Sequence, residues 1–445
     1  MSWQGNEATT VVPFGEAFWF WLKLGFISFG GPAGQIAVMH HELVEKRHWL
    51  SERRFLHGLN YCMLLPGPEA QQHATYIGWL MHGTWGGVVA GSLFVLPSLL
   101  ILTLLSWIYL VSGNTPLVAA LFYGIKPAVT AIVVHACYRI GSRALKNGWH
   151  VAIAAGAFAA LFGLRAPFPV VIAGAALVGV LGGRYAPGRF TSRAHQAGEK
   201  HYGPATLDDD TPLPAHASFA WERLLRTTIV CALLWAGPML ALFWRYGGQG
   251  TLTQMGWFFT KAAFLTFGGA YAVLPYVYQG AVEQFGWLTA PQMIDGLALG
   301  ETTPGPLIMV VTFVGFMGGA HKAALGPGLE WQAGVVAAMV VTYFTFLPSF
   351  FFIFAGAPLI EASKGNGKLA APLAAITAAV VGVILNLAMF FAYHVCWPQG
   401  LAGPPDWPSA LIAGLGLLAL FRFKLGVLSL IGASALLGLL ITFLR

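Results

Sequence analysis

The sequence predicts an all-α polytopic membrane protein built from two homologous, inverted halves with broken helices. Of the 445 residues, 57% are hydrophobic and only 9% are charged, whereas soluble proteins carry about 25% charged residues. The apolar residues form long unbroken runs, which disfavours the alternating pattern of a β-barrel. Several motifs also occur twice at one constant spacing. These features argue against a soluble enzyme, a nucleic-acid-binding protein and a disordered scaffold.

Charge and cysteine content exclude other classes. The net charge of +7 comes from basic residues in a few short hydrophilic segments, which in membrane proteins set orientation and contact headgroups. The four cysteines are far apart and form no C-x-x-C motif, so neither a disulfide framework nor a zinc site is expected. His40 and His41 define no ligand set, and we expect neither a metal nor a cofactor. No basic residue precedes Lys23, so the first apolar segment is expected to stay in the membrane.

A membrane-spanning helix needs about 20 apolar residues, which predicts about 12 to 13 transmembrane segments. Six candidates lie in the first part, at residues 14–39, 55–81, 84–111, 116–138, 149–164 and 168–183. Seven follow, at residues 226–246, 252–279, 292–320, 332–360, 369–396, 407–421 and 424–443. The stretch between the two groups is rich in Pro, Gly, His and charge and reads as a linker. The predicted organisation is a membrane domain at 1–183, a linker at 184–225, an extra helix at 226–250 and a second membrane domain at 251–445.

The internal repeat is the most informative feature of the sequence. Residues 23–31 match residues 261–269, and further matches follow at the same spacing: Trp49-Leu50-Ser51 with Trp287-Leu288-Thr289, and Pro66-Gly67-Pro68 with Pro304-Gly305-Pro306. After a small insertion, Leu96-Pro97-Ser98 resembles Leu347-Pro348-Ser349. Ser51 and Thr289 are expected to cap helices, Thr289 with Gln292 at capping-box spacing.

The repeat also predicts a topology. An odd number of crossings between the copies makes the two halves inverted, as in many secondary transporters, and residues 226–246 supply the crossing that reverses the second copy. A weak excess of basic residues in the loops predicts a cytoplasmic N-terminus, although the basic loop at residues 40–54 favours the opposite orientation.

Both copies contain the same two interruptions, one at Gly-Gly and one at Pro-Gly-Pro. Proline and glycine break a helix, and unpaired backbone at membrane depth is tolerated only against protein or a polar cavity. Paired breaks therefore indicate a binding site at the membrane midplane. Two alternatives stay open: kinks that serve packing alone, and re-entrant hairpins in place of full spans, which would serve the same site.

A helix that restarts after Pro-Gly-Pro presents free N–H groups and the positive end of its dipole, which favours a multi-oxygen anion. The candidate binding residues around the breaks are Gly30, Gly31, Gln35, Asn60, Pro66, Gly67, Glu69, Gln71, Gln72, Gly268, Gly269, Thr302, Thr303 and Gly305. Lys23 and Lys261 join them, because a lysine in an apolar run is costly unless it is paired or faces a cavity. Snorkelling of both lysines to the interface is the alternative.

Two carboxylates flank the second break, Glu69 in the first half and Glu301 in the second. A membrane-embedded carboxylate can be neutral or charged, which suits proton coupling. A structural ion pair with Lys23, Lys261 or Arg54 is the alternative.

Residues 30–32, 49–78, 267–275 and 302–319 resemble the long-chain chromate ion transporter family, and the resemblance spans most of the chain outside the linker and the extra helix. It implies a bacterial inner-membrane protein that exports chromate and confers resistance to it, with sulfate as a competitor. It also implies that residues 30–32, Arg53, Asn60 and residues 66–69 are functionally important, together with their second-half partners. Chromate would sit between opposed helix N-termini, and the inverted halves would rock about it.

Because the sequence has no G-x-x-x-x-G-K-[ST] motif, the expected driving force is an ion gradient, with a proton-linked antiporter as the main hypothesis. Two other classes stay open: a transporter of sulfate that handles chromate as a mimic, and a membrane enzyme. H-E-x-x-H is absent and Ser92 is only a weak candidate nucleophile, so we expect no enzymatic activity. The expected partners are chromate, the lipid bilayer and, as an open option, a second copy in a homodimer, but not nucleic acid. Lys23→Ala or Glu69→Gln is expected to abolish transport without lowering membrane abundance.

Overall fold

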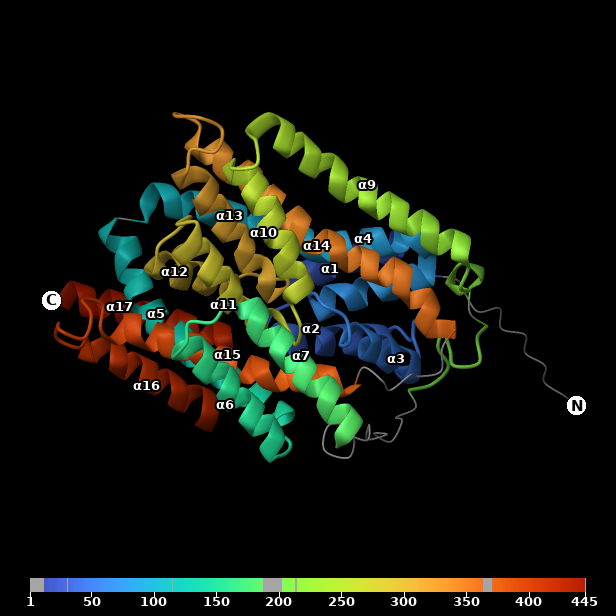
Figure 1. The fold of residues 1–445 in the computed structure, drawn as a ribbon, viewed down its shortest axis with the longest axis horizontal. Coiled ribbons are helices and arrows are strands. Elements are labelled where there is room, and N and C mark those ends of the chain that lie inside the picture. The colour runs from blue at the N-terminus through green and yellow to red at the C-terminus, as the bar shows by residue number, and fades with distance from the viewer. Residues whose placement is uncertain are drawn as a thin grey trace, which may run out of the picture.

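The computed structural model describes residues 12–29, 31–113, 115–186, 202–212, 214–362 and 370–444. Within these ranges it contains sixteen α-helices and no β-strand (Figure 1). Seven of the described helices are long and apolar enough to cross a membrane, namely α4, α5, α7, α9, α14, α15 and α17. The prediction of an all-α polytopic membrane protein is confirmed.

The predicted segments correspond closely to the helices. The first half contains α1 (Phe14–Ile27), α2 (Gly31–His40), α3 (Glu52–Cys62), α4 (Glu69–Ser112), α5 (Pro116–Ala144), α6 (Gly148–Phe162) and α7 (Phe168–Tyr185). The second part contains α9 (Trp221–Tyr246), α10 (Thr251–Leu265), α11 (Ala270–Tyr278), α12 (Ala290–Thr302), α13 (Val310–His321), α14 (Glu330–Ala362), α15 (Ala370–Cys396), α16 (Trp407–Arg422) and α17 (Val427–Leu444). The four segments with predicted interruptions are each split into two helices at the expected place.

Each split segment folds back on itself as a helical hairpin. Gly58 of α3 packs directly against the ring of Tyr76 in α4, on the far side of the Pro-Gly-Pro break. Gly296 of α12 packs in the same way against Phe313 of α13. Two straight, continuous spans would keep these pairs far apart, since a helix rises about 1.5 Å per residue. The hairpin, which the sequence left open as an alternative, is therefore the geometry of the Pro-Gly-Pro segments.

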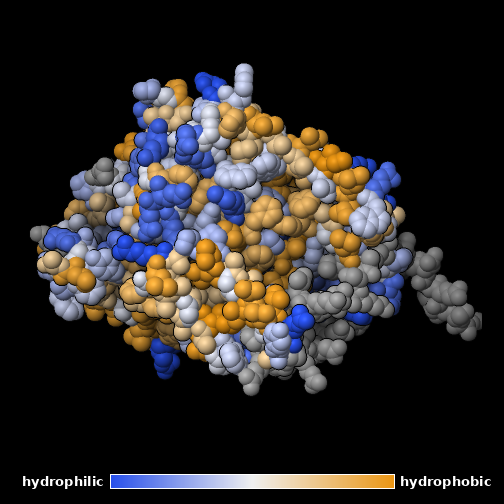
Figure 2. Space-filling view, in the orientation of Figure 1, coloured by the Kyte–Doolittle hydropathy of each residue, from blue (hydrophilic) through white to orange (hydrophobic). Residues whose placement is uncertain are grey.

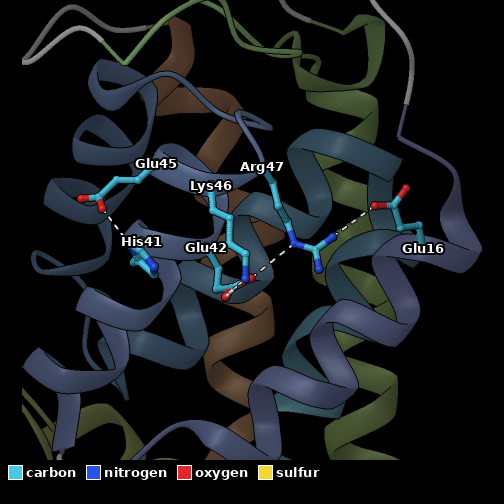
Figure 3. A network of polar contacts seen from close by, with 6 residues as sticks. All are labelled: Glu16, His41, Glu42, Glu45, Lys46 and Arg47. Carbon is cyan, nitrogen blue, oxygen red and sulfur yellow. Dashed lines mark hydrogen bonds and ion pairs between the residues drawn. The ribbon is translucent and has the colours of Figure 1, made fainter.

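The Gly-Gly segments are hairpins as well. Arg47, which follows α2, forms an ion pair with Glu16 near the start of α1, at 3.1 Å. The same guanidinium is 3.5 Å from Glu42, which also pairs with Lys46 at 3.2 Å (Figure 3). Burial alone would raise the pKa of the Glu42 carboxyl, but the hydrogen bonds and charges of Lys46 and Arg47 outweigh it and lower that pKa. This network closes the open end of the first hairpin.

The backbone of the two halves repeats in register. A π-helical stretch follows α2 at His41–Lys46, and another follows α11 at Gln279–Gln284. The helices that lead into Pro-Gly-Pro are capped as predicted: the Ser51 side chain accepts from the backbone N–H of Arg54, and Thr289 forms a complete capping box with Gln292. The duplication is therefore one of structure as well as of sequence.

Equivalent helices of the two halves pack against each other in antiparallel fashion. α4 reverses direction at Gly83, and in its second part Gly87 packs against Phe354 of α14 while Gly91 packs against Phe350. Around this central pair the halves exchange neighbours, since α16 and α17 pack on α5, and α6 and α7 pack on α15 (Figure 1). Small residues such as Gly124 and Gly438 allow the close approach.

The extra helix α9 lies along one edge of the molecule (Figure 1). About two thirds of its residues are exposed, with Trp244 at 89% and Leu233 at 66%, and within the helix only Met239 is buried. Figure 2 shows a broad apolar area over this edge. A continuous apolar surface of this kind fits contact with lipid. α9 begins at Trp221, slightly before the predicted start of the extra helix at residue 226.

The described part of the linker is attached to the first half. Leu207 pairs with Leu50 in a single parallel bridge, and the Ser51 hydroxyl donates to Asp209 at 2.6 Å. Further along, His216 bonds to the backbone carbonyl of Trp79 at 2.8 Å. These contacts hold the linker against the loop that joins the two hairpins of the first half.

Candidate functional site

The hairpin tips of opposite halves are joined by backbone hydrogen bonds. The Gly67 N–H donates to the Thr266 carbonyl at 2.7 Å, and the Gly305 N–H donates to the Ser28 carbonyl at 2.7 Å. Gly67 and Gly305 occupy equivalent positions in the repeat, and so do Ser28 and Thr266. Each Pro-Gly-Pro tip therefore binds the Gly-Gly tip of the other half. We call the Gly67–Thr266 contact the first junction and the Gly305–Ser28 contact the second.

Glycine is required at both Pro-Gly-Pro tips. Gly67 has φ of +127° and Gly305 has φ of +99°, values that L-residues avoid. A Cβ on Gly67 would lie 2.5 Å from the Gln72 amide nitrogen and 2.6 Å from the Ser349 hydroxyl. A Cβ on Gly305 would lie 2.8 Å from the Cβ of Ser98. The tips are thus packed closely against side chains from both halves.

Buried polar groups surround both junctions. Gln72 donates to the Pro66 carbonyl at 2.7 Å, and Gln35 donates to the Gly305 carbonyl at 2.5 Å. An oxygen of each of five buried side chains has no hydrogen-bond partner among the described residues: Ser28, Gln35, Gln72, Ser98 and Ser349. Buried polar groups are normally hydrogen-bonded. Such a concentration of unpartnered oxygens at two equivalent places indicates a site that takes up a polar ligand or water.

The two junctions are linked by the central helix pair. Ser98 of α4 lies at the second junction, whereas Ser349 of α14 lies at the first. The antiparallel contact of α4 with α14 therefore connects them. The described contacts of both junctions involve no lysine or arginine side chain, so positive potential there comes from the N-termini of α4 and of the Leu307–His321 segment.

Several predicted binding residues lie at the junctions, namely Gln35, Pro66, Gly67, Gln72 and Gly305. Gln71 is fully buried one position before Gln72, and its amide nitrogen donates to the Thr75 hydroxyl at 3.1 Å. Gly31, Gly268 and Gly269 have positive φ at the Gly-Gly tips. Gly30 lies outside the described residues.

Other predicted binding residues are placed elsewhere or are already bonded. The hydroxyls of Thr302 and Thr303 donate to carbonyls of their own helix, at 2.9 Å and 3.2 Å. Asn60 and Arg53 are exposed on α3. Asn60 and Arg53 therefore lie outside the buried junctions, and the hydroxyls of Thr302 and Thr303 already donate to their own helix.

Lys23 and Lys261 are both exposed on the outside of their helices. The Lys261 ammonium lies 6.0 Å from the ring of Trp257, beside an apolar groove between α9, α10 and α14. This placement favours snorkelling to the interface, the alternative that the sequence left open.

Lys23→Ala tests the two roles of this lysine. From its exposure we expect chromate flux to stay within about twofold of the parent, since an exposed charge contributes little to a buried site. The measurement is flux in reconstituted vesicles, normalised to the amount of protein inserted. Loss of flux at unchanged abundance would instead return Lys23 to the binding site.

The two predicted coupling carboxylates differ in their surroundings. Glu69 is the first residue of α4, is half-buried and makes no hydrogen bond or ion pair with any described residue. Glu301 is buried and accepts a hydrogen bond from the hydroxyl of Tyr271. Neither carboxylate contacts Lys23, Lys261 or Arg54 within the described ranges. Arg54 instead donates to the Thr211 carbonyl of the linker.

Sequence reasoning missed three serines at the junctions, Ser28, Ser98 and Ser349. A signal for them was present, because the Leu-Pro-Ser motifs match between the halves and Ser28 is equivalent to Thr266. Chemistry was assigned only to residues beside the helix breaks. The serines of α4 and α14 reach the breaks through tertiary packing.

Apolar helices around two equivalent, buried polar junctions define a multi-pass membrane protein with an internal polar site. The chain belongs to the chromate transporter family, whose model matches residues 15–180 and 253–439. It is 32% identical to the chromate transport protein of Pseudomonas aeruginosa, over 98% of this chain and 96% of that protein. It is 30% identical to the probable chromate transport protein of Synechococcus elongatus, over 92% and 89% of the two chains. The chromate transport protein of Cupriavidus metallidurans is 29% identical, over 94% and 91%. No solved structure matches the chain.

Proposed function

We propose that this protein is a secondary active transporter that exports chromate across the bacterial inner membrane and thereby confers chromate resistance. The observation that carries the proposal is the pair of equivalent junctions, each lined by buried oxygens without a partner in the described residues. The family and the names of its curated relatives supply the substrate. The N-terminus is proposed to be cytoplasmic.

The junction chemistry suits a tetrahedral oxyanion. The hydroxyls of Ser98 and Ser349 can donate to it, and helix N-termini add N–H donors and a positive potential. The free amide oxygens of Gln35 and Gln72 accept hydrogen bonds, from water kept in the site or from a protonated oxyanion. Sulfate shares the tetrahedral shape, so a sulfate carrier that takes chromate as a mimic is the second candidate.

Alternating access follows if the halves are inverted in the membrane. Two features support inversion: α4 runs antiparallel to its equivalent α14, and the hairpins do not cross the protein. Among the described helices, the crossings between the copies are then the second part of α4, α5, α6, α7 and α9, an odd number. Rocking one half against the other would open the junctions to each side in turn.

A carboxylate near the junctions is proposed to link transport to protons. Glu69 is the first residue of α4, directly after the Pro-Gly-Pro tip. A carboxylate there can be protonated or ionised, depending on whether the anion is bound. Glu301, which accepts a hydrogen bond from Tyr271, is the proposed coupling carboxylate of the second half.

Glu69→Gln is expected to abolish proton-driven chromate transport, so that a pH gradient no longer stimulates chromate flux, because the amide cannot exchange a proton. The measurement is chromate flux in proteoliposomes of the purified protein, with and without an imposed gradient, and with sulfate as competitor. Sulfate moving faster than chromate would support the second candidate. Folded protein that moves neither anion would exclude the carrier function.

A further inference from the structure

A buried ion pair connects the two halves away from the junctions. The Lys126 ammonium of α5 lies 3.3 Å from one carboxylate oxygen of Asp295 in α12. The hydroxyl of Tyr109 in α4 donates to the other oxygen at 2.8 Å. The Asp295 side chain is 4% exposed and that of Lys126 is 29% exposed. Ionisable groups at such depth are costly and in membrane proteins are usually functional.

The position of this pair relates it to the movement proposed above. Asp295 lies about two helical turns, roughly 12 Å along α12, before the Pro-Gly-Pro tip of the second half. Lys126 and Tyr109 both belong to the first half. The pair therefore spans the boundary that must open and close as one half rocks against the other.

The pair also breaks the symmetry of the repeat. The position equivalent to Asp295 in the first half is occupied by His57 of α3. α15, the counterpart of α5, contains no Asp, Glu, Lys or Arg in Ala370–Cys396. The junctions occur twice, but this ion pair has no counterpart built from the same residue types. It can therefore distinguish one side of the protein from the other.

The remaining charged groups on the neighbouring helices act elsewhere. Glu301, on the same helix, is bonded to Tyr271 of α11, and Arg139 of α5 is a positive charge that acts on it. His321 of α13 bonds to the Trp287 carbonyl at 3.1 Å. α15 offers only His394, which bonds within its own helix at 3.0 Å, and α17 has no ionisable side chain in Val427–Leu444. Asp295 thus faces Lys126 and Tyr109.

We propose that Asp295 is a proton-binding site that locks and releases α12 against α5, a role that rests on the proposed carrier function. With Asp295 ionised, the ion pair with Lys126 holds the second-half hairpin to the first half. A proton from the adjacent aqueous phase forms an O–H bond on the carboxylate, which neutralises it and releases the Lys126 ammonium. Loss of the proton restores the pair and closes that side.

The test uses the full-length protein in proteoliposomes, with the membrane potential clamped by potassium and valinomycin. Two quantities are measured: chromate exchange at equal pH, and chromate accumulation under a pH gradient. For one proton per chromate, each pH unit raises the accumulation ratio about tenfold in the parent. In Asp295→Asn we expect chromate exchange at equal pH to remain measurable, with an accumulation ratio that no longer responds to the gradient.

A double variant separates coupling from a structural role. Neutralising both partners of a buried ion pair is often harmless to stability, whereas removing one leaves an unpaired charge. The double variant Asp295→Asn with Lys126→Met is therefore expected to recover any stability or chromate exchange that the single variant loses. It should still show no response to the pH gradient. Tyr109→Phe is the matched control, because it removes a hydrogen bond and keeps the acid; it should retain the gradient response.

Each contrary result has one meaning. A full gradient response in Asp295→Asn, or its recovery in the double variant, would overturn the proposal and leave a structural ion pair. Chromate exchange in the parent without any gradient response would also overturn it, while the carrier function would stand. Absence of chromate movement in the parent would overturn the carrier function itself.

Discussion

Replacing Gly67 with alanine is expected to lower chromate flux about 100-fold without removing the protein from the membrane. The backbone of Gly67 has φ of +127°, and a Cβ would lie 2.5 Å from the Gln72 amide and 2.6 Å from the Ser349 hydroxyl. Backbone strain costs about 1–3 kcal/mol and overpacking about as much. The tip must shift, which breaks the bond from Gly67 to Thr266. A penalty of about 3 kcal/mol lowers the competent population about 100-fold.

The control for this variant is Gly174→Ala in α7. No atom would lie within 4 Å of a Cβ at Gly174, so flux should stay within about twofold of the parent. Gly305→Ala at the second junction should behave like Gly67→Ala, because a Cβ there would lie 2.8 Å from Ser98. Initial chromate flux per inserted protein is the measurement. Equal flux in the Gly67 and Gly174 variants would show that the junction is not needed for transport.

Gln72→Leu is expected to weaken chromate binding about 10- to 100-fold. The substitution removes the bond to the Pro66 carbonyl and the free amide oxygen beside the first junction. A hydrogen bond donated to that oxygen by a protonated, singly charged oxyanion contributes about 1.5–3 kcal/mol, and a carbonyl left unpaired adds a cost of its own. The measurement is the dissociation constant of chromate for the purified protein, with sulfate as a second ligand.

The matched control is Gln254→Leu, since the Gln254 side chain donates to Gln249 in an exposed hydrogen bond of 3.1 Å. This variant should bind chromate like the parent. Gln35→Leu tests the second junction, where Gln35 donates to the Gly305 carbonyl. If only one of the two junction variants lost affinity, the ligand would occupy one junction in the state measured. An unchanged dissociation constant in both would place the site elsewhere.

Much of the fold could be predicted from the chain alone, because its main signals are local. Hydropathy located the apolar segments, and proline and glycine located the four interruptions. The caps at Ser51 and Thr289 were predictable since the capping side-chain oxygen and the backbone N–H that donates to it lie within one helical turn. The repeat indicated that the interruptions and the caps occur in both halves. Membership of the chromate transporter family followed from the same motifs.

The direction of the chain after each break could not be predicted in this way. A Pro-Gly or Gly-Gly break permits many angles, so a straight span and a hairpin have the same hydropathy. Packing decides between them: Gly58 admits the ring of Tyr76, and Gly296 admits Phe313. These contacts join residues on opposite arms of a hairpin, and no local pattern predicts them.

The sequence by itself therefore determined the class of the protein, its duplicated halves and the places where its helices break. Only the tertiary structure decided what meets at those breaks. It joined Gly67 to Thr266 and Gly305 to Ser28 across the halves, and it left Lys23 on the outside. It also paired Asp295 with Lys126. The physical reason is that a buried polar group needs a partner within hydrogen-bond reach, and at the two junctions and at Asp295 that partner comes from the opposite half of the chain.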